Sequence, residues 1–245
     1  MTSKVALITG ASRGIGRATA ELFATRGWKV MINYYNSETE ARELRDRLQQ
    51  QGCSVETFRA DVTDRSQVEA MVEACAVIFG GVDLLINNAG IAKTTLFQEI
   101  AEPEWDRIID VDLKSVYLCS QAVLRRMIPQ KSGRIINIAS IWGITGASCE
   151  VHYSAAKAGV IGLTKALAKE LGPSNIQVNC IATGVIDTEM LAGLDQEELE
   201  DLRDRTPLGR LGTPAEIAAC AWFLASEEAG FITGQIISPN GGFTI

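Results

Sequence analysis

Short apolar runs alternate with longer segments of helical periodicity along the whole chain. The runs are rich in β-branched and aliphatic residues and have the length of strands; they cover residues 5–9, 29–33, 54–59, 84–87, 134–139, 176–181 and 235–238. In the segments between them, apolar residues recur with the spacing of one helix face. This alternation predicts βαβ units, and therefore an α/β fold built on a parallel sheet.

Two helix starts carry a recognisable polar signature. Ser37 with Glu40, and Thr213 with Glu216, have the spacing of a capping box, in which each side chain bonds the backbone of the other residue. We therefore predict helices that begin just after Ser37 and Thr213.

The stretch 187–205 is the least regular part of the pattern. It is polar, rich in acids, and follows the sixth predicted strand. At the carboxyl edge of a parallel sheet such a segment is well placed to cover a site as a lid. Because no Gly-, Ser- or Pro-rich linker divides the chain, we predict one domain spanning residues 1–245.

Composition narrows the class of protein. The 245 residues are 47% hydrophobic and 22% charged, which is typical of a globular protein, and the net charge of −7 gives no reason to expect nucleic acid or an anionic membrane as partner. Six widely spaced cysteines and a single histidine fit neither a zinc motif nor a dense disulfide framework. No apolar run approaches the length of a membrane span. We expect a cytoplasmic protein with reduced thiols.

A glycine-rich turn follows the first predicted strand and opens the first predicted helix. Residues 9–16 read T-G-A-S-R-G-I-G. Gly10 permits a tight turn, Gly14 lets backbone N–H groups approach a pyrophosphate, and Gly16 allows close packing of helix on sheet. The spacing differs from the commoner G-x-G-x-x-G, but the strand–loop–helix context predicts a dinucleotide site.

The end of the second predicted strand bears on which dinucleotide binds. A site for NAD usually carries an acid there, which holds the ribose 2′-hydroxyl. Residues 33–37 read N-Y-Y-N-S, with no carboxylate before Glu38, and Arg13 projects from the glycine loop. A basic residue beside uncharged hydrogen-bonding groups suits a 2′-phosphate, so we predict NADP(H). The alternative is that Arg13 is only a solvated loop residue.

A tyrosine and a lysine stand one helical turn apart. Tyr153 and Lys157 are separated by four residues and share a face of a predicted helix. A free phenol has a pKa of about 10, and a neighbouring ammonium group lowers that pKa by stabilising the phenolate. Ser140 lies thirteen residues before Tyr153, just after the fifth predicted strand, and can direct a hydroxyl to the same substrate oxygen.

Together these features resemble the short-chain dehydrogenase/reductase family. The resemblance runs from the first strand to the last residues and rests on several motifs in the right order. They are residues 9–16, Asp61-Val62, Asn87-Asn88-Ala89-Gly90, Ser140, Tyr153-Ser154-Ala155-Ala156-Lys157, residues 184–190 and Gly241-Gly242. The resemblance implies a Rossmann-type, doubly wound parallel sheet of about seven strands with helices on both faces, and a homotetramer.

The resemblance also implies a set of cofactor contacts. The residues expected at the cofactor are Gly10, Ser12, Arg13, Gly14, Ile15, Gly16, Asn33, Asp61, Val62, Asn88, Ala89, Gly90, Tyr153, Lys157, Gly184, Ile186 and Thr188. Arg13 and Asn33 would lie near the 2′-phosphate, and residues 61–62 at the adenine. Lys157 would hold the nicotinamide ribose, and Thr188 would approach the carboxamide.

The family's mechanism implies roles for four residues. Tyr153 protonates the carbonyl oxygen while a hydride arrives from the nicotinamide, Lys157 tunes the tyrosine and links it to a proton relay, and Ser140 orients the substrate. The relay position is usually asparagine, but here it is Asp112. Because a carboxylate tends to raise the pKa of a nearby phenol, we predict a catalytic role for Asp112 and a shifted pH optimum.

Within the family, the overall likeness is greatest to reductases that act on 3-oxoacyl groups carried by acyl carrier protein in fatty acid synthesis. That resemblance implies reduction to a 3-hydroxyacyl thioester with NADPH. Acyl carrier protein is acidic, and Arg125, Arg126 and Lys131 are candidate contacts for it. The acids at 195–201 in the predicted lid oppose such a partner.

The segment 140–152 leads to an alternative. With Trp142 and Glu150 as substrate-side residues, it resembles reductases that act on the 5-aminopentanone modification of elongation factor P. Glu150 suits an amine-bearing ketone, but it can also be a solvated loop acid or an intersubunit ion-pair partner. We expect His152 and Cys149 to be non-catalytic. An alternative of another class is an NADP-binding sensor without catalysis, which the intact serine, tyrosine and lysine argue against.

Overall fold

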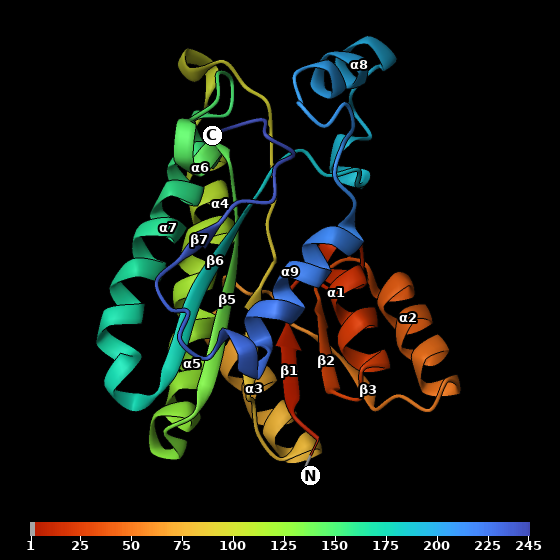
Figure 1. The fold of residues 1–245 in the computed structure, drawn as a ribbon, viewed down its shortest axis with the longest axis vertical. Coiled ribbons are helices and arrows are strands. Elements are labelled where there is room, and N and C mark those ends of the chain that lie inside the picture. Colours follow the sequence, from red (N-terminus) through yellow and green to blue (C-terminus); the bar gives the residue numbers. More distant parts are fainter. Residues whose placement is uncertain (1–2) are drawn as a thin grey trace.

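A single parallel sheet forms the centre of the protein. The computed structural model describes residues 3–245, and within them the sheet has seven strands in the order β3-β2-β1-β4-β5-β6-β7 (Figure 1). The strands are β1 (Val5–Ile8), β2 (Lys29–Tyr34), β3 (Val55–Arg59), β4 (Leu84–Asn87), β5 (Gly133–Ser140), β6 (Ile176–Thr183) and β7 (Ile236–Ile237). The predicted strands are thus confirmed, and the doubly wound α/β class with them. The strand order reverses between β1 and β4, which is where ligands bind in such sheets.

Helices cover both faces of this sheet. One face is covered by α1 (Gly14–Thr25), α2 (Glu38–Gln50) and α9 (Pro214–Ala225). The other is covered by α3 (Arg65–Phe79), α5 (Ser115–Gln130) and α7 (Val151–Leu171). Shorter helices are α4 (Glu102–Ile109), α6 (Trp142–Thr145) and α8 (Gln196–Asp204). Because both faces are covered, the inner strands are apolar along their length instead of alternating; all four residues of β1 are buried.

The helix starts give one confirmed prediction and one that is wrong. Thr213 and Glu216 form the predicted capping box, with the Thr213 N–H donating to Glu216 Oε2 at 2.8 Å. Ser37 does precede α2, but its side chain makes no capping hydrogen bond. Its backbone, at φ −92° and ψ 64°, is outside the extended conformation from which a capping side chain reaches the helix.

The predicted lid segment, residues 187–205, contains more helix than its irregular pattern indicated. It holds a 3₁₀ turn (Glu189–Leu191) and α8, which begins with a capping box between Asp195 and Glu198. Two of its acids, Glu197 and Glu198, lie in the first turn of this helix, where they complement its positive end. In Figure 1, α8 stands apart from the sheet above its carboxyl edge. Within residues 3–245, no helix combines the length and apolar character needed to cross a membrane.

Candidate functional site

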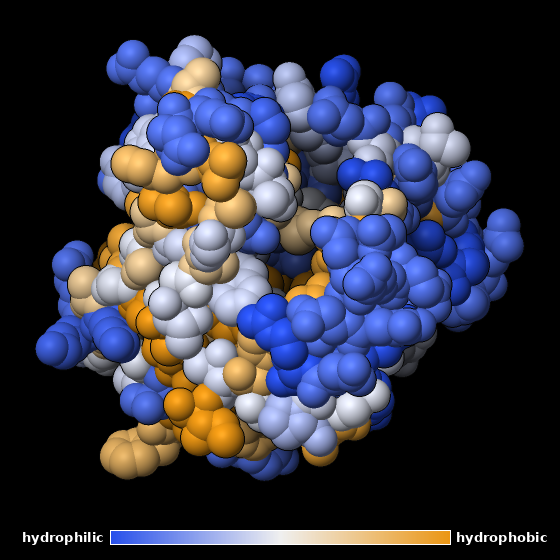
Figure 2. Space-filling model, turned by 90° about the horizontal axis from the view of Figure 1, so that it is seen from above, coloured by the Kyte–Doolittle hydropathy of each residue, from blue (hydrophilic) through white to orange (hydrophobic). Residues whose placement is uncertain are grey.

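The carboxyl ends of the strands bring the predicted residues to one edge of the sheet. Figure 2 looks down on this edge and shows a recess near its centre, bordered on one side by a strongly hydrophilic surface. The loops that follow β1, β4, β5 and β6 all begin at this edge because the strands are parallel.

The glycine loop after β1 is held tightly against the loop after β4. Gly10 and Gly14 have positive φ angles of 60° and 52°. A Cβ atom on Gly10 would lie 2.8 Å from the Cα of Ala89, so only glycine fits. The Asn88 amide donates to the carbonyls of Thr9 at 2.9 Å and Gly10 at 3.0 Å. Neutral hydrogen bonds therefore shape this loop.

The start of α1 fits a dinucleotide pyrophosphate. The helix begins at Gly14, its N-cap Arg13 makes no side-chain capping bond, and its first turn holds no acid. Its first N–H groups are thus left for an anion, in the partial positive charge of the helix end. A Cβ on Gly16 would lie 2.5 Å from Asn88 Nδ2, so the absence of a side chain allows the close packing the sequence predicted. Ser12 is buried and Ile15 packs on the core beside them.

Asn33 is expected near the 2′-phosphate, but its side chain points into the protein. This side chain is buried, and its Oδ1 accepts the Gly10 N–H at 3.1 Å while its amide nitrogen donates to backbone carbonyls, among them that of Ala60 at 3.1 Å. Because both ends are engaged inside the protein, Asn33 shapes the glycine loop. Arg13 lies exposed and forms an ion pair with Glu189, at 2.9 Å.

Sequence reasoning missed a second cation in this region. Arg59 ends β3 and lies in register with Tyr34 at the end of β2. Its guanidinium carbon lies 5.8 Å from the centroid of the Tyr35 ring, and its Nε donates to the Tyr35 carbonyl. Both are exposed, so the pair offers a cation and an aromatic surface at this edge of the site. The sequence could have indicated Arg59, because the second and third predicted strands are neighbours in a parallel sheet and end side by side.

The remaining cofactor candidates line the same edge. Asp61 Oδ1 accepts two bonds from Thr63, the N–H at 2.9 Å and the hydroxyl at 2.7 Å, and Val62 beside it is buried. Thr188 lies over the glycine loop, since a Cβ on Gly14 would be 3.5 Å from its methyl group. The loop after β6 is held by close packing of Gly184 on Asn240 and by an isolated bridge between Ile186 and Gly212.

Ser140, Tyr153 and Lys157 come together at the end of β5. Ser140 is the last residue of β5 and is buried, and its Oγ accepts the Trp142 N–H at 3.1 Å. Tyr153 and Lys157 lie on the first two turns of α7, with the lysine Nζ 5.4 Å from the centroid of the tyrosine ring. Lys157 Nζ also donates to the Ile138 carbonyl at 3.3 Å. The predicted serine, tyrosine and lysine thus form one cluster.

The electrostatics of Tyr153 differ from the simple expectation of an acidified phenol. Burial is the largest influence and raises the pKa of Tyr153 above its ordinary value, and the charges of Asp112 and Glu150 raise it further. Lys157 and a hydrogen bond with Ser140 lower the pKa, as expected, but they are outweighed. The positive charge of an oxidised nicotinamide would act in the same direction as Lys157.

Asp112 lies directly against the lysine. It is fully buried in a single turn of π-helix, Asp110–Lys114, and its Oδ2 lies 3.0 Å from Lys157 Nζ. Its Oδ1 accepts the Ile91 N–H at 2.9 Å. The sequence placed Asp112 near the lysine but gave no sign of the π-helical turn, a feature often found at functional sites.

His152 precedes the tyrosine but faces another way. It is fully buried, and its Nε2 lies 3.3 Å from Glu104 Oε1 on α4. Glu104 also accepts the Thr95 hydroxyl at 2.7 Å and pairs with Lys93. His152 therefore belongs to the contact between α4 and α7.

The two substrate-side candidates lie close to this cluster along the chain, Trp142 two residues after Ser140 and Glu150 three residues before Tyr153. The Trp142 ring packs edge-on against Phe243, with ring centroids 5.6 Å apart, so a residue near the end of the chain contributes to this wall. Glu150 immediately precedes α7, makes no capping bond, and is half-buried. Burial raises the pKa of its carboxyl group, and no basic side chain among the described residues lies within ion-pair distance of it.

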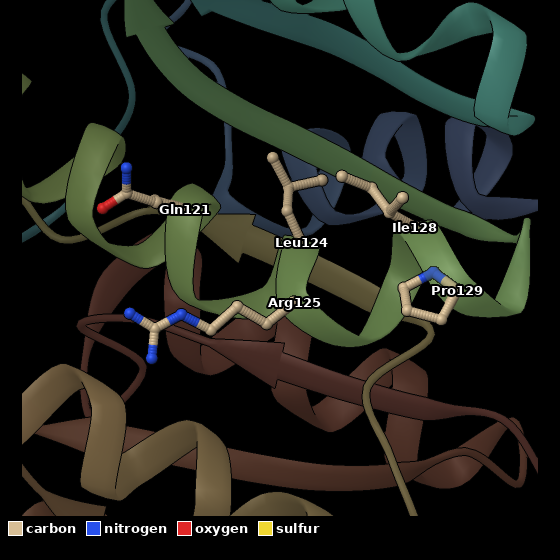
Figure 3. Close-up of a pocket in the computed structure, with 5 residues that line it drawn as sticks. All are labelled: Gln121, Leu124, Arg125, Ile128 and Pro129. Atoms are coloured by element: carbon tan, nitrogen blue, oxygen red, sulfur yellow. The ribbon is translucent and has the colours of Figure 1, made fainter.

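A separate depression on α5 is unrelated to this cluster. Figure 3 shows its lining, which comes entirely from that helix: Gln121, Leu124, Arg125, Ile128 and Pro129. Arg125 at its edge pairs with Glu69 of α3 at 2.8 Å, and the neighbouring Arg126 pairs with Glu73. Both arginines proposed as contacts for an acidic partner thus form exposed ion pairs on the protein surface.

Comparison with known proteins places the chain in a family. Residues 10–244 match the family described as Enoyl-(Acyl carrier protein) reductase. Together with the fold and the Ser140, Tyr153 and Lys157 cluster, this match shows that the chain belongs to the short-chain dehydrogenase/reductase family. The predicted enzyme class is confirmed: an oxidoreductase acting on CH–OH and C=O groups with a nicotinamide cofactor.

Individual relatives are similar over almost the whole chain. The 3-oxoacyl-[acyl-carrier-protein] reductase FabG of Chlamydia muridarum is 44% identical over 242 residues, covering 99% of this chain and 98% of the relative. The protein of the same name from Vibrio cholerae is 45% identical with the same coverage. That from Staphylococcus aureus is 42% identical over 240 residues, covering 98% of each chain.

Proposed function

We propose that this protein reduces 3-oxoacyl groups on acyl carrier protein to 3-hydroxyacyl groups, with NADPH as reductant, as a cytoplasmic homotetramer. The observation that carries the proposed reaction is the cluster at the end of β5, where Lys157 Nζ lies 5.4 Å from the Tyr153 ring and Ser140 is buried beside it. The near full-length similarity to reductases of that name supports the substrate.

The proposed roles follow from the contacts of each side chain. Ser140 positions the substrate carbonyl by donating a hydrogen bond to its oxygen, and Tyr153 delivers the phenolic proton to that same oxygen. The chemistry that a reduced nicotinamide would supply, when bound, is the hydride for the carbonyl carbon. Lys157 stabilises the phenolate that remains, because its ammonium lies over the ring. The carbonyl thus gains one hydride and one proton and becomes an alcohol.

The choice of NADPH rests on charge at the ends of β2 and β3. Arg13 and Arg59 are both exposed at this edge, and no acid stands at the end of β2. A 2′-phosphate is a strong acceptor for arginine, whereas NAD would call for an acid. In this proposal Arg13 leaves Glu189 when the phosphate binds, which costs little because the pair is exposed.

A second candidate substrate is favoured by one specific observation. Glu150 is a half-buried carboxylate, without a basic partner among the described residues, whose charge acts on Tyr153. Such a group favours a ketone that carries a positive charge, as in the aminopentanone modification of elongation factor P.

Competition between the two substrates tests the proposal. Oxidation of NADPH is followed with acetoacetyl-acyl carrier protein, with aminopentanone-modified elongation factor P, and with both together. We expect turnover of the acyl carrier substrate, with the modified factor a weak competitor. Reduction of the modified factor alone would overturn the fatty acid assignment. Binding of NADPH without turnover of either substrate or of simple β-keto esters would indicate a sensor instead.

A further inference from the structure

The ion pair between Asp112 and Lys157 is closed off from solvent. The exposed fractions of the two side chains are 0% and 5%. On the β4 side the pair is covered by Gly90, where a Cβ would lie 2.9 Å from Asp112 Oδ2 and 3.3 Å from Lys157 Nζ. The aspartate is held from behind by the Ile91 N–H. Charges this deeply buried are weakly screened, so each acts strongly on its neighbours.

We propose that Asp112 is a positioning residue whose carboxylate offsets the charge of Lys157 and keeps the Tyr153 phenol protonated, so that carbonyl reduction persists to higher pH than asparagine at this position would allow. This inference rests on the proposed roles of Tyr153 and Lys157. It concerns the pH range of the reaction and leaves the choice of substrate open.

The net charge beside the phenol decides how readily it gives up its proton. A lone ammonium attracts the phenolate and so makes the phenol a stronger acid. When a carboxylate lies 3.0 Å from that ammonium, the pair carries no net charge, and its attraction for a phenolate on the far side of the ammonium falls. The phenol then gives up its proton only at higher pH.

The other titratable groups around the cluster do not replace this effect. Glu150, before α7, adds negative charge and acts in the same direction as Asp112. His152 on α7 lies against Glu104 of α4, and its influence on Asp112 is to lower the pKa of that carboxyl group. The Cys180 thiol on β6 lies beside Lys157, and burial raises the pKa of that thiol to about 12, which leaves it neutral.

The titration directions agree with this geometry. Burial is the largest single influence and lowers the pKa of Lys157, but the charge and hydrogen bond of Asp112, together with the charge of Tyr153, outweigh it, so the lysine stays an ammonium. Burial raises the pKa of Asp112 and Lys157 opposes the rise. After burial and Lys157, the carboxylate of Asp112 is the next influence on the pKa of Tyr153, and it raises that pKa.

The consequence extends to both directions of the reaction. Reduction uses the phenol as acid, so its rate falls as pH rises through the pKa of Tyr153. Alcohol oxidation uses the phenolate as base, so its rate rises through the same pKa. Removal of a charge beside the phenol shifts the pKa of Tyr153 in the same direction whichever form of the cofactor is bound, so both profiles should move the same way.

The test is the pair of pH profiles of Asp112→Asn. Asparagine has the same shape and keeps an oxygen for the Ile91 N–H, but carries no charge. We expect the pH at which kcat for reduction falls, and the pH at which kcat for oxidation rises, both to move down by about 1 pH unit. This is the effect expected from removing one nearby charge. The matched control is Asp110→Asn on the same π-helical turn, whose partner Lys114 is exposed, and there we expect no shift.

A second measurement does not depend on turnover. The ultraviolet absorbance of phenolate is followed during alkaline titration, and the Tyr153→Phe titration is subtracted to isolate Tyr153. In the unmodified protein we expect ionisation above the ordinary value of about 10, and in Asp112→Asn, or in Asp112→Ser should the asparagine variant not fold, at lower pH. Ionisation below 10 in the unmodified protein, or an unshifted titration in the neutral variant, would overturn the inference.

The two proposals fail in different ways. If Tyr153→Phe abolishes reduction while Asp112→Asn leaves both inflections unmoved, the proposed reaction stands and the role of Asp112 is wrong. If Tyr153→Phe reduces ketones at full rate, the proposed mechanism itself is wrong. A lower maximal kcat in Asp112→Asn, with no change in the pH at which kcat changes, would indicate structural damage only. That result would also overturn the role given to Asp112.

Discussion

Two ion pairs of nearly equal length lie on opposite sides of the site. Arg13 and Glu189 are 2.9 Å apart with side chains 53% and 65% exposed, whereas Lys157 and Asp112 are 3.0 Å apart with side chains 5% and 0% exposed. An exposed pair contributes about 0–1 kcal/mol to stability, while removal of one partner of a buried pair costs about 3–5 kcal/mol. Burial, and not distance, separates the two.

This difference matches what each side of the site has to do. The exposed pair joins the glycine loop to the lid segment and can open at little cost when an anionic ligand competes for the arginine. The buried pair cannot separate without leaving a charge in the protein interior, so it is suited to holding a fixed electrostatic environment around the tyrosine. The exposed pair can therefore rearrange when a ligand binds, whereas the buried pair holds the charges around Tyr153 in place before the reaction begins.

The largest expected effect tests the interior. Tyr153→Phe removes the proton donor, and we expect kcat for NADPH-driven reduction to fall by about 10²- to 10⁴-fold, with NADPH affinity retained. The matched control is Tyr117→Phe, an exposed tyrosine of α5 that contacts Arg65, and it should leave kcat unchanged. Steady-state kinetics and fluorescence titration of NADPH give the two quantities. A fully active Tyr153→Phe variant would contradict the mechanism.

The next largest effect is on the stability of the protein, which should depend more on the buried ion pair than on the exposed one. We expect Lys157→Met to lower the free energy of unfolding by about 3–5 kcal/mol, and Arg13→Met by at most about 1 kcal/mol. The neutral pairing Lys157→Met with Asp112→Asn should recover part of the loss. Urea unfolding measures all of these, and equal losses at the two sites would contradict the comparison.

The loss in Lys157→Met should also depend on pH. Burial raises the folded-state pKa of Asp112 above its unfolded value, and removal of Lys157 takes away the main opposing influence. A group with a raised folded-state pKa is stabilising when protonated, and that contribution is lost as pH rises through the folded-state value. The deficit should therefore shrink in acid and grow towards neutral pH.

An effect of intermediate size is expected at the exposed arginines, Arg13 and Arg59, which we propose to bind the 2′-phosphate of NADPH. We expect Arg59→Gln and Arg13→Gln each to raise KM for NADPH by about tenfold, because each removes a charged hydrogen-bond donor from the 2′-phosphate, and to change KM for NADH little. Arg125→Gln, at the depression on α5, is the control (Figure 3). Equal effects on NADPH and NADH would contradict a role in 2′-phosphate recognition.

The smallest effect distinguishes the two substrate candidates. If an amine-bearing ketone is the substrate, Glu150→Gln should lower its kcat/KM by about fivefold relative to a neutral ketone, as expected of one partly exposed ion pair. If the substrate is an acyl carrier thioester, the ratio should stay unchanged. Glu200→Gln on α8 is the exposed acidic control.

Much of this protein could be predicted from local patterns. Apolar runs of strand length give the sheet, because a parallel sheet buried on both faces needs them. Gly10, Gly14 and Gly16 identify the phosphate loop, because only glycine accepts those turns and close contacts. Tyr153 and Lys157 share a helix face through their spacing alone. Each of these features depends on residues close together in the chain.

Other features depended on the tertiary structure. Arg59 and Tyr35 meet because two parallel strands end side by side, and Asn33 turns inward because its amide completes bonds between separate strands. The resemblance to the family implies that Asp112 lies near the lysine. Whether the two charges are solvated, bridged by water or in direct contact depends on the packing of Gly90 and the π-helical turn around them. The strength of an electrostatic interaction depends on what surrounds the charges, and those surroundings come from segments distant in sequence.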